Sequence, residues 1–334
     1  MPSRRVAPLF CLATVMLTPS ELVHLHLLLN HFPTVGMIVG FGVFLLALVK
    51  KSEDLKRGGL AVLFVIALLS LPTYMTGYSA QKSVRTMPGV SQALIDLHQR
   101  SALLALIFME ATGLVSWYGL WYSRRGTSAG RRNTAAVLLF SVVTIGLMAS
   151  AADVGGEIRH PEIVSNSEAA SATEGLLAPR WLASDFITRY QYRHPWAWKT
   201  LETIHFMGLC LLFGVVLVAN MRLLGWMRNA PLEGFHRLLP WGVWGFVANA
   251  VTGMMFFIGQ AFQYIENPAF HWKMLCILLA GGDILYLTWH DEIWEMGPGD
   301  AAPLTVKVLA ASQICLWVGV IYFGRMLPYL GDAF

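Results

Sequence analysis

The chain has 334 residues, of which 56% are hydrophobic and only 13% are charged. Soluble domains carry about 25% charged residues, so this composition excludes an ordinary soluble protein and indicates a membrane protein. The formal net charge of +4 does not favour nucleic-acid binding, because membrane topology accounts for the arginines in the loops. The four cysteines lie far apart without a C-x-x-C motif, which excludes a disulfide framework, a zinc ribbon and covalent haem attachment.

Long apolar segments predict eight membrane-spanning helices. About 20 apolar residues cross a bilayer, and outside closed barrels only helices satisfy their own backbone in lipid. The predicted spans cover residues 22–49, 58–78, 98–122, 134–152, 200–224, 237–262, 271–289 and 304–326. We therefore expect an all-α integral membrane protein.

The spans divide into two tandem four-helix units, at 21–152 and 200–334, joined by a loop at 153–199. Arg4 and Arg5 precede an apolar run that is too short to span, so residues 1–20 resemble a signal peptide. No clean cleavage site follows, and we expect a retained interfacial segment.

Lysine and arginine predict the orientation of the chain. They concentrate in the turns at 49–58, 123–133 and 222–237, which the positive-inside rule assigns to the cytoplasm. The loops at 79–97 and 153–199 then face outward. The pattern predicts a multi-pass protein of the bacterial inner membrane.

Two histidines and a later acid recur at matching spacing in the two units. The histidines are 67 residues apart in the first unit and 66 in the second, and the acid follows after 12 residues in both. The matching residues are His31, His98 and Glu110 in the first unit, and His205, His271 and Asp283 in the second. This spacing favours a duplicated unit. The acids could carry protons, line a quinone pocket or simply pack.

The histidines fall on the first and third helix of each unit, all at the outer end. Histidine inside a membrane helix is uncommon and functional by default. First and third helices are diagonal neighbours in an up-down-up-down square, so a flat macrocycle can stand between two axial imidazoles. We therefore predict two non-covalent haem b groups, ligated by His31 with His98 and by His205 with His271. Basic residues would face the propionates: Arg100, Arg159, Arg193, Lys199 and Lys273.

Three more histidines lie near the predicted outer end: His24, His26 and His160. His24 or His26 could pair with His160 around a third haem near the surface. Together with His31 and His98, the H-x-H pattern could instead hold copper or iron. Interfacial histidines without any cofactor remain the alternative.

Several motifs add a family resemblance. Through H-L-H-L-L-L-N-H-F-P-T-V-G (24–36) and G-G-E-I-R-H-P-E-I (155–163), the first half resembles a family of uncharacterised bacterial four-helix membrane proteins. The second half is similar to another such family through L-E-T-I-H (201–205) and N-P-A-F (267–270). This second resemblance implies that the position of His271 is often another residue. Neither resemblance implies a reaction, and the likeness to b-type cytochromes is one of architecture.

The sequence thus favours a b-type cytochrome that passes electrons between the quinone pool and a periplasmic partner, such as a c-type cytochrome. It would be the electron-transfer subunit of a larger oxidoreductase complex. Haems at one level would move electrons along the membrane plane rather than across it. The alternatives are a copper- or iron-handling membrane protein and a cofactor-free anchor or scaffold subunit.

Overall fold

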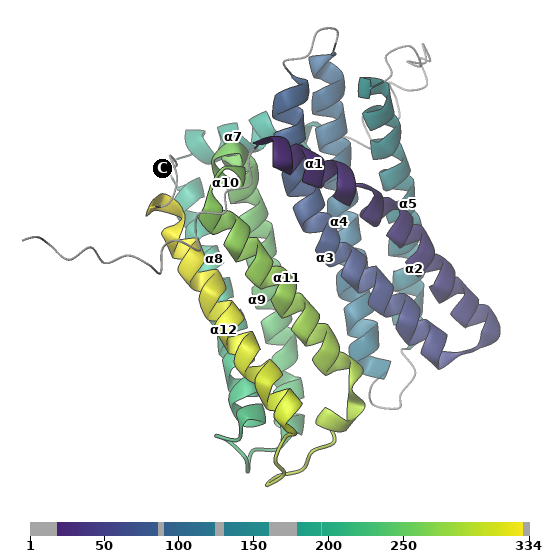
Figure 1. The fold of residues 1–334 in the computed structure, drawn as a ribbon, viewed down its shortest axis with the longest axis vertical. Helices are drawn as coiled ribbons and strands as arrows, with labels where there is room; N and C mark the ends of the chain where they lie inside the picture. The colour runs from purple at the N-terminus through teal and green to yellow at the C-terminus, as the bar shows by residue number, and fades with distance from the viewer. Residues whose placement is uncertain (1–18, 86–89, 124–129, 160–178, 195, 330–334) are drawn as a thin grey trace, which may run out of the picture.

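The computed structural model describes residues 19–85, 90–123, 130–159, 179–194 and 196–329. Within these residues the chain is helical throughout (Figure 1). The long helices are α1 (Pro19–Leu29), α2 (His31–Lys50), α3 (Glu53–Val84), α4 (Gln92–Ser123), α5 (Arg131–Arg159), α8 (Ala197–Leu224), α9 (Leu232–Gly259), α11 (Pro268–Trp289) and α12 (Leu304–Met326). Shorter ones are η3 (Arg180–Leu182), α7 (Ser184–Arg193), α10 (Ala261–Ile265), η4 (Asp291–Ile293) and η5 (Leu327–Tyr329).

Eight spans in the described residues are long and apolar enough to cross a membrane, with α1 and α2 together forming the first. Their outward faces carry large apolar side chains, among them Leu28, Val49, Leu139, Met207 and Leu304. Such faces are stable against lipid tails but not against water. The prediction of an all-α, multi-pass membrane protein is confirmed.

The first predicted span is interrupted at Asn30, between α1 and α2. Pro33 lies just beyond the interruption and has no amide hydrogen, so the carbonyl of Leu29 loses its helical partner. The hydroxyl of Thr73 on α3 lies 3.4 Å from that carbonyl. In this way α1 is held against α3, while α2 continues down the side of the first half (Figure 1).

Two predicted boundaries change in ways that matter for the site. The helix α4 begins at Gln92, so His98 lies inside a helix rather than at its start. The outer loop predicted at 153–199 contains helical structure, because α5 continues to Arg159 and α7 occupies Ser184–Arg193. Residues 1–18 and 160–178 lie outside the described residues.

Each half of the chain packs mainly on itself. In the first half α3 contacts α2 and α4, and α5 contacts α4 and α2, which closes a four-helix arrangement. In the second half α8 contacts α9 and α12, and α12 contacts α11. A Cβ atom at Gly245 of α9 would lie 2.7 Å from the carbonyl oxygen of Gly208 on α8. These small residues let the two backbones approach closely, as in other membrane helix pairs.

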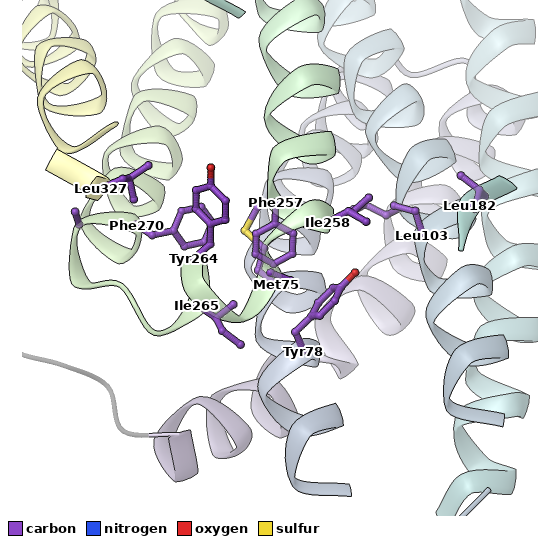
Figure 2. Close-up of a cluster of buried hydrophobic side chains, with 13 residues drawn as sticks. Met75, Tyr78, Leu103, Leu182, Phe257, Ile258, Tyr264, Ile265, Phe270 and Leu327 are labelled. Atoms are coloured by element: carbon purple, nitrogen blue, oxygen red, sulfur yellow. The ribbon is translucent and has the colours of Figure 1, made fainter. Parts of the chain in front are cut away.

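An aromatic cluster joins the two halves at the end of the molecule where α1, α7 and α10 lie (Figures 1 and 2). Tyr78 of α3 packs edge-on against Phe257 of α9, with 5.2 Å between ring centroids. Phe257 also stacks on Phe270 of α11 at 5.6 Å. The cluster therefore fixes the ends of α3 and α4 relative to the turn between α9 and α11.

Candidate functional site

His26 faces α3 from α1. Its Nδ1 lies 2.9 Å from the carbonyl oxygen of Thr73 and 3.3 Å from the hydroxyl of Thr76. A carbonyl oxygen only accepts hydrogen bonds, so Nδ1 carries the proton in the neutral ring and Nε2 keeps its lone pair. A Cβ atom at Gly77 would lie 3.2 Å from Cε1 of the ring. The imidazole therefore rests directly on the backbone of α3.

His98 on α4 has the same arrangement. Its Nδ1 lies 2.9 Å from the carbonyl oxygen of Ala151 on α5, so Nε2 again keeps its lone pair. A Cβ atom at Gly155 would lie 3.0 Å from Cε1. Metal-bound histidines commonly donate their second ring nitrogen to a backbone carbonyl in this way.

In the first half, His26 and His98 share one arrangement, a part-buried imidazole whose Nδ1 lies on a backbone carbonyl. His98 also contributes to the electrostatic environment of His26. The predicted ligand His31 is instead the first residue of α2 and has an exposed side chain, and His24 on α1 is exposed as well. His160 and the side chain of Arg159 lie outside the described residues. In the described part of the chain, His26 rather than His31 therefore shares the packed environment of His98.

The second half repeats the His26 arrangement at His205. Nδ1 of His205 on α8 lies 2.8 Å from the hydroxyl of Thr252 on α9. Thr252 donates its own hydrogen to the carbonyl of Ala248 at 2.6 Å, so its oxygen accepts from His205. A Cβ atom at Gly253 would lie 3.4 Å from Cε1 of His205. In both halves a histidine thus contacts a Thr-Gly pair on the next membrane-spanning helix.

His271 does not copy His98. Its Nε2 lies 2.7 Å from the carbonyl oxygen of Ile265 in the preceding short helix α10, and its Nδ1 is buried without a hydrogen-bond partner. The group of α11 within electrostatic range of His205 is Lys273, whose side chain runs past Gly324 of α12. The spacing of the histidines singled out His271. Only the packing of α11 against α12 shows where the side chain of Lys273 lies.

Both intramembrane acids bind a serine of a neighbouring helix. Ser70 of α3 donates to Oε1 of Glu110 on α4 at 2.9 Å. Ser312 of α12 donates to Oδ2 of Asp283 on α11. A buried carboxyl group needs such partners, because an unsatisfied polar group in lipid is costly.

A multi-ligand metal centre is not formed by the described residues. Among them, no three or more histidine, cysteine, aspartate or glutamate side chains lie close enough together to hold a metal ion. The two exposed histidines of the H-x-H region, His24 and His31, therefore complete no such cluster with His26 and His98. A haem site with two axial imidazoles does not require a cluster of three such side chains.

The chain matches no protein-family model, no curated protein and no solved structure.

Proposed function

We propose that this protein is a b-type cytochrome of the bacterial inner membrane. It would serve as the electron-transfer subunit of a larger complex, between the quinone pool and a periplasmic partner such as a c-type cytochrome. The observation that carries the proposal is the pair His26 and His98. Their side chains come from α1 and α4 and each keeps Nε2 as the lone-pair nitrogen.

The residues around this pair fit a haem b group. Two imidazoles supply axial ligands, and Gly77 and Gly155 leave the rings room against the backbone. The carbonyls of Thr73 and Ala151 hold the rings in one tautomer and make each Nε2 a stronger ligand. When bound, haem b supplies one-electron iron chemistry, and the protein supplies ligands, orientation and a low dielectric. His26 thus replaces His31 in the proposed ligand pair.

A second haem in the second half is supported by His205, whose contacts with Thr252 and Gly253 match those of His26. The predicted second ligand, His271, does not match His98, because its Nε2 lies against the carbonyl oxygen of Ile265. Lys273 of α11 acts electrostatically on His205 and would serve as a propionate partner. Two haems at this one end would pass electrons along the membrane plane.

The charge of the turns supports the orientation. Lys50 and Lys51 lie in the turn between α2 and α3, and Arg222 and Arg228 lie at and after the end of α8. These turns lie at the end of the molecule opposite α1 and α7 (Figure 1). The positive-inside rule then puts the histidine end in the periplasm.

A haem assay on purified variants tests the proposal. We expect the wild type to give a b-type pyridine haemochrome spectrum, and His26→Ala or His98→Ala to lose the low-spin band of the first site. His24→Ala on α1 and His31→Ala on α2 remove exposed histidines, and these controls should keep it. A protein without a b-type band contradicts the cytochrome, and loss of the band in His31→Ala alone contradicts the ligand assignment.

A further inference from the structure

An open cleft of about 1040 Å³ separates the two halves at the histidine end of the molecule. Three parts of the chain line it: the neighbouring ends of α3 and α4, the first half of α7, and the turn between α9 and α10. Two side chains of the cluster that joins the halves, Tyr78 and Ile258, also line the cleft (Figure 2). The cleft is therefore built by the packing of one half on the other.

The cleft combines aromatic rings with amides. Tyr78 and Phe262 meet edge-on with 6.1 Å between ring centroids. The amide of Gln99 donates to the hydroxyl of Tyr78 at 2.5 Å. Gln260 and Gln263 add amides from the opposite wall. A planar, neutral ligand with polar oxygens at its edge suits such a lining.

The charged groups of the cleft are largely paired with each other. Arg85 binds Asp96 at 2.8 Å between Nη2 and Oδ1, and Arg189 binds Asp185. The Asp96 side chain is 59% exposed and that of Asp185 is 63% exposed. The two carboxylates are thus in contact with water and can pass protons to it. Because they offset two of the arginines, the lining does not select for an anion.

The cleft lies beside the histidine pair. Gln99 directly follows His98, and Tyr78 directly follows Gly77, on which His26 rests. Successive helical residues point about 100° apart, so cleft and histidines are on different sides of α3 and α4 but at one level. The separation is on the order of one helix diameter, about 10 Å. This is a short path for an electron.

From these contacts we infer that the cleft binds a hydroquinone headgroup and is where the donor reduces the protein. The inference rests on the proposed cytochrome function. The headgroup would pack against Tyr78 and Phe262, and its hydroxyls would bond to the amides of Gln99 and Gln260. Oxidation to the quinone releases two protons and two electrons. The two protons would pass to water by way of Asp96. The two electrons would pass singly to the ferric haem of the proposed function and on to a one-electron acceptor such as a c-type cytochrome.

Reduction by a soluble quinol tests the inference. Purified protein is mixed with decylubiquinol, and in parallel with menadiol, and haem reduction is followed by absorbance. We expect Gln99→Leu and Phe262→Ala to slow reduction about tenfold, the loss of one hydrogen bond or one packed ring. Dithionite should still reduce both variants fully. The controls Gln92→Leu on α4 and Phe206→Ala on α8 lie outside the cleft lining and should keep the wild-type rate.

Photolabelling separates this inference from the proposed function, because it needs no haem. An azidoquinone should label peptides from α4, α7 or the α9–α10 turn, and excess decylubiquinone should suppress the label. Labelling there in a protein without haem supports a quinone site and overturns the cytochrome. Haem reduction at unchanged rates in both cleft variants, or labelling elsewhere only, overturns the cleft as the quinol site and leaves the cytochrome standing.

Discussion

The imidazole of His26 lies on the backbone of Gly77, where a Cβ atom would be 3.2 Å from Cε1. His205 and Gly253 stand in the same relation at 3.4 Å. Contacts of 3.0–3.4 Å require the neighbour to move by a few tenths of an ångström, so a side chain at either glycine displaces the ring. The two glycines therefore set how close each histidine comes to its helix partner.

Replacing Gly77 by valine should lower the haem content of the first site, because the branched side chain pushes His26 off α3. The ratio of haem to protein, measured by pyridine haemochrome, should fall clearly below the wild-type value. Gly146→Val on α5 is the matched control, since a Cβ atom there meets nothing within 4 Å. Equal losses in both variants would point to general helix damage instead.

Thr252→Val should weaken the second site. The substitution keeps the shape of the side chain but removes the oxygen that accepts from Nδ1 of His205. Loss of such an outer partner typically lowers metal affinity by about 10–100-fold. The transfer of haem to added apomyoglobin measures the haem affinity. Thr203→Val on the exposed face of α8 is the control. An unchanged haem affinity would show that Thr252 does not support His205 as a ligand. The comparison with Thr76 and His26 would then fail as well.

Arg222→Met should destabilise the end opposite the histidines. The guanidinium is fully buried and donates to the carbonyls of Ala230 at 2.7 Å, Gly297 at 2.9 Å and Asp300 at 3.3 Å. Removing it leaves buried carbonyls without donors, at a cost of about 3 kcal/mol in the free energy of unfolding. Denaturation in detergent measures the cost. The exposed Arg228→Met should stay within about 0.5 kcal/mol of wild type.

Ser70 and Glu110 should be energetically coupled across α3 and α4, because a hydrogen bond of 2.9 Å joins them. The bond is part-buried. A double-mutant cycle with Ser70→Ala and Glu110→Ala should give an interaction free energy of about 0.5–3 kcal/mol. The pair Thr203→Val and Glu110→Ala, whose residues lie in different halves, should be additive. Additivity in the Ser70 cycle as well would show that the serine does not stabilise the acid.

The membrane spans could be predicted from sequence because hydropathy is a local property. Each span is a run of apolar residues, and its length decides whether it crosses a bilayer. The ends were less predictable, as α3 and α4 show. Both have 32 residues, about 48 Å at 1.5 Å per residue, which exceeds the hydrocarbon thickness. The polar end of α3 packs against α10, and that of α4 packs against η3, and both contacts are tertiary.

The histidine pairing was only partly predictable. The sequence by itself determined that the chain is an all-α membrane protein and that few, spaced histidines gather near one end of it. It could not decide which of His26 and His31 faces the protein, because five residues of one continuous helix would turn the two side chains about 140° apart. Only the tertiary structure shows which side chain is packed: α1 lies on α3, where Thr76 and Gly77 offer His26 a hydrogen bond and an open backbone, whereas His31 is exposed. The cleft between the halves was equally invisible in sequence, since its walls come from three separate segments, within 78–100, 183–189 and 258–263, that meet only when one half packs on the other.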